Sequence, residues 1–259
     1  IVNFNCRYKH TYLPLLPRRN KLTKEQLRAD PSYNKLCEAY KVILDHLRSN
    51  TNDANELSNF EGSEDRCARA LLETCHSDSY ISEQLEGIVS RVLAVDEEDV
   101  YRNVNAQNTN GIICQGPIRV NSCCPHHLYP VMYEVYVAYI PRDGRVLGLS
   151  KLARLCKVLG RRPVLHEQLA SDIADVLCAP EQDVGDLDGN KKLLPFKFPA
   201  LQSDGSAVLV VGVHTCVACR GVQEDARTAV CELRGNFNLP HMEQKFYSLI
   251  KSNRIASIG

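Results

Sequence analysis

The sequence predicts an α+β fold in which an antiparallel sheet is backed by two helices. Three observations between residues 111 and 259 lead to this prediction. Apolar residues alternate with their neighbours from Val131 to Tyr139, which is the periodicity of a strand. Two segments with apolar residues at helical spacing follow, at 150–159 and 165–177. Further strand-like segments come after them, so the order is strand pair, helix pair and strand pair.

Local patterns justify each of these elements. The strand at 131–139 is largely apolar on both faces, so both faces are expected to be covered. Residues 141–144 form a predicted turn, and Ser150 is expected to start the first helix. Short strands are expected at 208–213 and 228–237. The second helix is expected to bury an apolar set at helical spacing: Leu165, Leu169, Ile173, Val176 and Leu177.

The chain before residue 111 is predicted to be an N-terminal extension. Residues 1–31 lack periodicity, contain several prolines and are expected to form an extended arm that docks on a neighbour. Residues 32–110 are expected to be mainly helical, with a helix of about four turns after Ser32 and shorter helices at 66–73 and 81–93. A polar loop is expected at 49–64.

Composition narrows the functional classes. The formal net charge is zero and the pI is near neutral, which gives no reason to expect nucleic acid or an anionic membrane as a partner. No apolar run reaches about 18 residues, so no membrane span is expected. The 12 cysteines are scattered, which favours metal binding in a reducing compartment, cytoplasmic or organellar (mitochondrial included), over a disulfide framework.

Two short clusters, Cys124–His127 and His214–Cys216, form a candidate metal centre. Thiolates and imidazoles are the ligands that zinc prefers, and a catalytic zinc keeps three protein ligands and one water. That water ionises at a pKa of about 7. The residue types alone leave two interpretations open: a zinc site with spare acid–base groups, or buried structural cysteines beside surface histidines.

Four more motifs accompany the two clusters in order. They are Gly148–Arg154, Arg161-Arg162, Glu167–Leu169 and Arg220–Val222. With this order and spacing, the chain resembles the GTP cyclohydrolase I family over about residues 112–250. The resemblance implies the tunnelling fold (T-fold), in which antiparallel sheets join side by side into a barrel. It also implies a homo-oligomer built as a decamer-like ring.

The resemblance implies a chemistry as well. Zn²⁺ would be held by Cys124, His127 and Cys216. The imidazole ring of the guanine of GTP would be opened by hydrolysis, giving formate and 7,8-dihydroneopterin triphosphate, the first step toward folates and tetrahydrobiopterin. His126 and His214 would transfer protons, and the alternative for both is to orient the metal ligands.

Substrate contacts follow from the same resemblance. Glu167 would accept two hydrogen bonds from the guanine edge, while Ser150 would bond the ribose or simply cap its helix. His166 stands where the family usually has Gln, which predicts an altered substrate contact. Cationic residues would hold the triphosphate, each with a solvated surface charge as its alternative: Lys151, Arg154, Arg220 and, from a neighbouring subunit, Arg66 with the weaker candidate Arg69.

Departures from the family pattern keep a second function open. Pro125 replaces the family Glu and cannot orient an imidazole or raise its basicity. Residues 179–207 form a longer crossing than usual and are interpreted as an insertion in the domain 111–259. An active enzyme is favoured, and the alternative is a degenerate homologue that serves as a structural or regulatory subunit of a larger assembly. A nitrile reductase of the same fold is disfavoured because it lacks this zinc triad.

Overall fold

The computed structural model describes residues 23–49, 60–89, 92–94, 111–142, 145–178 and 201–256. Contacts divide the chain into two compact units, residues 1–73 and 74–259. Most of the arm predicted at 1–31 lies outside the described residues. Its last part forms the short helix α1 (Lys24–Arg28), whose first turn is closed by a capping box between Thr23 and Gln26.

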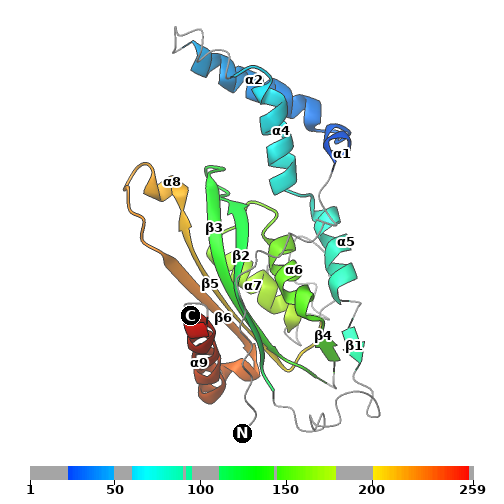
Figure 1. The fold of residues 1–259 in the computed structure, drawn as a ribbon, viewed down its shortest axis with the longest axis vertical. Helices are drawn as coiled ribbons and strands as arrows, with labels where there is room; N and C mark the ends of the chain where they lie inside the picture. The colour runs from blue at the N-terminus through cyan, green and yellow to red at the C-terminus, as the bar shows by residue number, and fades with distance from the viewer. Residues whose placement is uncertain are drawn as a thin grey trace, which may run out of the picture. The chain divides into compact units, whose positions relative to one another are not determined.

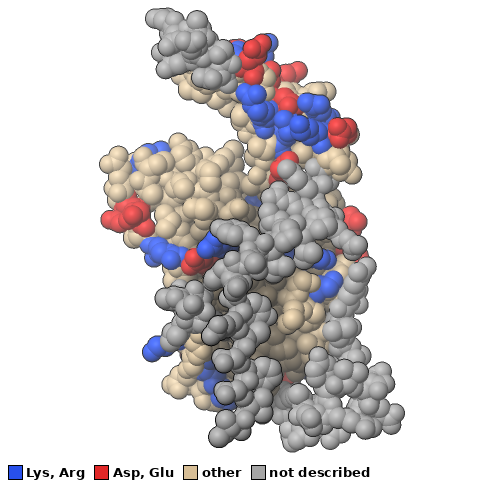
Figure 2. All heavy atoms as spheres, in the orientation of Figure 1, with Lys and Arg blue, Asp and Glu red and all other residues tan. Residues whose placement is uncertain are grey.

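The first unit also contains α2 (Tyr33–Arg48) and most of α4 (Ser63–Thr74). The long helix predicted after Ser32 is therefore confirmed, although Ile43 and Leu47 on its apolar face are exposed. Acidic and basic side chains are interspersed over these helices (Figure 2). Asp65 of α4 joins all three, because its carboxylate accepts hydrogen bonds from Arg28 of α1 and Tyr33 of α2.

The second unit begins with α5 (Asp78–Val89), which buries Ile81, Leu85 and Ile88 as expected. The expected helix boundary at residue 93 is wrong. Val92 lies in the short strand β1 (Val92–Ala94), which pairs antiparallel with β4 (Arg145–Leu147). Pairing with another strand overrides the helical spacing of Val92, a β-branched residue that suits a strand.

The main sheet has four antiparallel strands in the order β2-β3-β5-β6 (Figure 1). They are β2 (Ile113–Cys123), β3 (Pro130–Ile140), β5 (Gly205–His214) and β6 (Thr228–Gly235). β5 begins inside the range interpreted as an insertion, of which residues 179–200 lie outside the described part. β6 ends earlier than expected, because Gly235 adopts a positive φ of 57° and Phe237 lies in the short helix η3 (Asn236–Asn238).

Helices cover both faces of this sheet (Figure 1). On one side, α6 (Leu149–Leu159) and α7 (His166–Leu177) form the larger core with α5. On the other side, α9 (Pro240–Ala256) packs Phe246 against a second cluster that includes Tyr136 and Ala138. The predicted α+β fold is confirmed, and α9, which the sequence did not predict, explains why both faces of β3 are apolar.

The expected helix start at Ser150 is wrong. Helix α6 begins at Leu149, and its N-cap is Gly148, whose carbonyl accepts a hydrogen bond from the Lys151 N–H at 2.8 Å. Ser150 is an exposed residue of the first turn. No side chain caps the first turn of α6. Among the described helices, none is long and apolar enough to cross a membrane.

Candidate metal centre and nucleotide site

The site lies at one end of the main sheet, where β2 and β5 end and β3 begins. Cys124 follows β2, His214 is the last residue of β5, and Cys216 lies in the short helix α8 (Thr215–Ala218). The register places His214 opposite Val131, near the start of β3. The Thr215 hydroxyl then donates to the carbonyl of Pro130 at 2.7 Å, which fixes the turn into α8.

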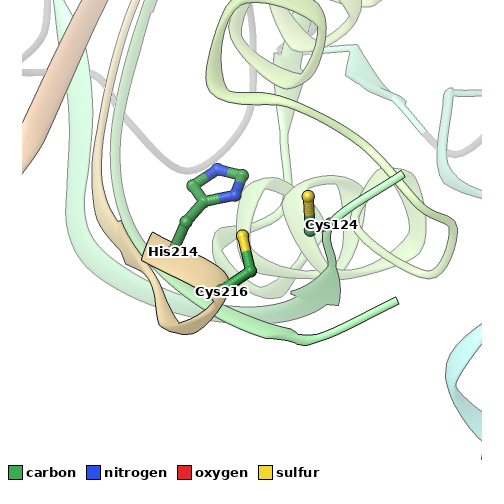
Figure 3. Close-up of side chains that lie close together, drawn as sticks. All are labelled: Cys124, His214 and Cys216. Carbon is green, nitrogen blue, oxygen red and sulfur yellow. The ribbon is translucent and has the colours of Figure 1, made fainter. Parts of the chain in front are cut away.

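Cys124, His214 and Cys216 point toward one another (Figure 3). One possible ligand atom from each lies within 4.8 Å of the others, and both cysteines are buried. Burial and the adjacent Cys124 raise the pKa of the Cys216 thiol. A bound cation would favour the thiolate form, and two sulfurs with an imidazole are a donor set that suits Zn²⁺.

His127 lies beside this group. Its Nδ1 is 3.7 Å from Sγ of Cys124, although its ring is exposed. A tetrahedral zinc ion with Zn–S of about 2.3 Å and Zn–N of about 2.0 Å separates two such ligands by about 3.5 Å. His127 is therefore close enough to share an ion with Cys124, and it stays the predicted third ligand. His126 is exposed next to it, with the two ring centroids 6.2 Å apart.

A second histidine supports His214 from within the protein. Nδ1 of His166 lies 3.3 Å from Nε2 of His214, and the His166 side chain is only 4% exposed. Burial lowers the pKa of both imidazoles, so both rings are neutral at neutral pH. A neutral ring has one donor and one acceptor nitrogen, so in this contact one of the two nitrogens carries the hydrogen and the other accepts it.

Tyr133 completes the pair, and the sequence analysis missed it. Its hydroxyl donates to the carbonyl of Val164 at 2.7 Å and lies 3.4 Å from Nε2 of His214. Gly212, opposite Tyr133 in β5, makes room for it. A Cβ at this position would lie 2.7 Å from Cδ1 of Tyr133 and 3.2 Å from Nε2 of His166. The only signal in the sequence was a glycine within a strand, which marks a close approach.

The segment 161–164 ties α7 to the end of β2. The Val164 N–H donates to the carbonyl of Cys123 at 3.2 Å, and the Ser122 hydroxyl donates to the carbonyl of Arg162 at 2.6 Å. Arg162 is buried in an ion pair with Asp172 of α7, and burial lowers the pKa of Arg162 to about 10. The start of α7 is thereby held beside the end of β2, where Cys124 follows.

Comparisons with known proteins agree with this geometry. A sequence model of GTP cyclohydrolase I matches residues 63–184. The GTP cyclohydrolase 1 of Thermoanaerobacter pseudethanolicus is 34% identical over 164 residues, which cover 62% of this chain and 77% of the relative. The GTP cyclohydrolase 1 of Caldanaerobacter subterraneus subsp. tengcongensis is 34% identical over 193 residues, which cover 74% of this chain and 90% of the relative. The chain belongs to the GTP cyclohydrolase I family.

That membership confirms the predicted family and the T-fold that it implies. A crystal structure of the archaeosine synthase QueF-Like in the apo form also aligns with this chain, over 49% of this chain and 97% of the QueF-Like chain. Its TM-score is 0.33 at 21% identity, a likeness too weak to carry an argument.

In this member of the GTP cyclohydrolase I family, the two cations predicted on α6 differ in their surroundings. Lys151 is only 9% exposed, and its Nζ donates to the carbonyl of Gly87 in α5 at 3.1 Å. Arg154, one turn further along α6, is exposed. The structure therefore leaves Arg154 accessible to an anion, whereas Lys151 also links two helices.

The other predicted substrate residues of the second unit lie on α7 and after α8. Glu167 is exposed in the first turn of α7, directly after the buried His166. Arg220 is exposed, with its guanidinium carbon 5.9 Å from the ring centroid of Tyr129. This distance suits a cation–π contact, which would hold the guanidinium near the turn that carries His127.

Arg66 and Arg69 belong to α4, in the first unit. Arg69 forms an ion pair with Asp65 at 2.8 Å, and Arg66 donates to the hydroxyl of Ser63 at 2.6 Å. Both therefore have local partners, and their contact with a substrate stays a prediction.

Proposed function

We propose that this protein is a zinc-dependent GTP cyclohydrolase I that converts GTP to 7,8-dihydroneopterin triphosphate and formate, the first step of pterin and folate biosynthesis. Family membership supports the reaction class. The observation that carries the proposal is the convergence of Cys124 and Cys216. These two buried cysteines are far apart in the sequence, yet their sulfurs share one small volume with an imidazole nitrogen.

Cys124, Cys216 and His127 are proposed to hold the ion. The separation of 3.7 Å between Nδ1 of His127 and Sγ of Cys124 is compatible with this set. The family resemblance favours His127, although the structure brings His214 to both cysteines. His214 is already within hydrogen-bonding distance of His166 and Tyr133. When bound, Zn²⁺ would supply a water that is ionised near neutral pH.

His214 and His126 are proposed to move protons as the imidazole ring of the guanine opens. The lowered pKa of His214 keeps its ring neutral at neutral pH, so one ring nitrogen can accept a proton. The Tyr133 hydroxyl has a pKa raised by burial, so it stays protonated beside His214. The exposed His126 can exchange protons with solvent.

Substrate recognition is proposed to use both helices that back the sheet. The Glu167 carboxylate would bind the guanine edge, and Ser150 the ribose. Arg154 and Arg220 would hold the triphosphate, with Lys151 near the start of α6, where the helix dipole favours anions. His166 would act through a substrate contact or through His214. Arg66 would reach the site of a neighbouring subunit in a decamer-like ring.

The alternative is a degenerate homologue that acts as a structural or regulatory subunit of a larger assembly. Pro125 favours it, because this exposed residue has no carboxylate to orient His126 or His127. In that case the metal would serve the fold alone.

The deciding experiment measures formate release from GTP by the purified chain supplied with Zn²⁺, and follows the pterin product by its absorbance. Equal amounts of formate and pterin are expected, with no product from a Cys216→Ala control. Absence of turnover with zinc bound and the oligomer intact would overturn the enzyme proposal and leave the structural subunit.

A further inference from the structure

We propose that Cys75 and Cys123 form a site of reversible oxidation, in which a low-molecular-weight disulfide such as oxidised glutathione converts the two thiols to a cross-link. Both cysteines are free thiols in this structure. Their Sγ atoms lie 3.5 Å apart, although 48 positions separate them in the sequence. The proposal does not depend on the activity proposed above.

The main chain holds the two thiols together. Cys75 lies in the connection between α4 and α5, and Cys123 is the last residue of β2. Next to Cys75, the His76 N–H donates to the carbonyl of Arg161 at 2.7 Å. The carbonyl of Cys123 accepts a hydrogen bond from Val164 at 3.2 Å. Both backbones are thus attached to the same short segment, 161–164, so the thiol contact does not depend on side-chain positions alone.

The pair is separate from the metal cysteines. Cys123 precedes Cys124, but its sulfur contacts Cys75, whereas Cys124 groups with His214 and Cys216. Oxidation of the pair can therefore leave both metal thiols unmodified. The distance to close is modest, because a disulfide bond of about 2.05 Å requires the two sulfurs to move about 1.5 Å closer.

The exposure of the two thiols gives the order of steps. Cys75 is partly exposed, whereas Cys123 is 5% exposed. The thiolate of Cys75 attacks one sulfur of oxidised glutathione, forms a mixed disulfide and releases one glutathione thiolate. The thiolate of Cys123 then attacks Sγ of Cys75 and releases the second. Two protein thiols are oxidised, one glutathione disulfide is reduced, and the two cysteine protons pass to the released thiolates.

The surroundings set the rate of this reaction. Burial raises the pKa of the Cys75 thiol, which attacks first, to about 12. The thiolate fraction is therefore small at neutral pH, and closure is slow. The pair stays reduced in a reducing compartment and closes only under sustained oxidation. Once closed, the bond ties the start of α5 to the end of β2 and constrains the unfolded chain.

The test equilibrates the full chain, supplied with Zn²⁺, with mixtures of oxidised and reduced glutathione. Free thiols are then alkylated, and tryptic peptides are mapped without reduction. The expected product links residues 70–91 to residues 120–142, with fragment spectra that assign the bond to Cys123 rather than Cys124. A melting temperature about 5 °C higher is expected, and dithiothreitol should reverse it. Full alkylation of Cys75 after oxidation would overturn the proposal, as would a Cys123 linked elsewhere.

Two variants separate this cross-link from general oxidation. Cys75→Ser should remove both the linked peptide and the rise in melting temperature. Cys67→Ser is the matched control, because Cys67 is also a partly buried free thiol but lies within α4. This variant should retain both the linked peptide and the rise in melting temperature. An equal oxidant-driven rise in Cys75→Ser would show that a different pair is responsible.

Discussion

Nε2 of His214 lies 3.3 Å from Nδ1 of His166, so the last residue of β5 and the first residue of α7 meet through their side chains. His166 is buried, and its ring contacts the rings of His214 and Tyr133. This arrangement makes His166 a candidate for positioning His214, in addition to the substrate contact expected from the sequence.

Replacing His166 by Leu should remove the hydrogen-bonding partner of His214. If the protein is an active cyclohydrolase, kcat for formate release should fall about 10-fold or more, while KM for GTP changes little. His166→Gln should retain more activity, because an amide can also bond to the His214 ring. A rise in KM with an unchanged kcat would instead indicate direct contact with the substrate.

Zinc content should distinguish the two candidate third ligands. We expect Cys124→Ala and His127→Ala to lose stoichiometric zinc, because each removes one of three protein ligands. His214→Ala should retain the metal and lose activity. The measurement is elemental analysis after dialysis against a weak chelator. Stoichiometric zinc in Cys124→Ala would contradict the ligand set. Loss of zinc from His214→Ala but not from His127→Ala would mean that His214, rather than His127, is the third ligand.

Replacing Pro125 by Glu restores the residue usual in the family. Pro125 lies in a turn closed by the Leu128 N–H, which donates to the carbonyl of Cys124 at 2.8 Å. Because Pro125 is exposed, a longer side chain fits there without repacking. Zinc content should be unchanged, and formate release unchanged or faster. A clear loss of activity would mean that Pro125 belongs to a rebuilt, working site.

Gly212 should not tolerate a side chain. The methyl group of Gly212→Ala would press on the Met132 carbonyl oxygen at 2.7 Å and on the Tyr133 ring, which costs about 1–3 kcal/mol. Gly87→Ala in α5 is the matched control, because its Cβ would meet no atom within 4 Å. That change should raise stability by up to about 1 kcal/mol. Urea unfolding would measure both, and equal effects would contradict the close packing at Gly212.

Asp65 should make stability depend on pH. Hydrogen bonds from Arg69, Arg28 and Tyr33 lower the pKa of its carboxyl group. An unfolded Asp has a pKa of about 3.9, so the stabilisation is complete above that value and is lost as the pH falls through the lower folded value. The difference in melting temperature between the natural protein and Asp65→Asn should therefore be large at pH 7 and shrink below about pH 4. Asp45→Asn, which alters only a weak surface pair, is the control. A difference that stays constant with pH would rule out the titration of Asp65 as its source.

Local periodicity was enough to predict much of this fold. The alternation in β3 and the apolar spacing of α7 each follow from one continuous segment, and both elements were predicted correctly. The cysteine and histidine motifs likewise predict where the candidate metal centre lies.

The remaining features depend on contacts between distant segments. Val92 forms a strand only because Leu147 lies opposite it. Tyr133 reaches His214 only because of the register between β3 and β5. Lys151 is buried only because α5 packs against α6, and no pattern within α6 reveals this. Sequence periodicity predicts which face of each helix or strand is apolar, whereas these features depend on which faces pack together in the fold.

The ladder that pairs Val131 with His214 has a consequence for how this protein can change. Side chains alternate between the two faces of a strand, so losing one residue between Gly205 and Val213 would turn the His214 imidazole away from Cys124. Many single substitutions in β5 leave that geometry intact. The length of this strand is therefore under stricter constraint than its composition, and sequence drift here should proceed by replacement rather than by gain or loss of residues.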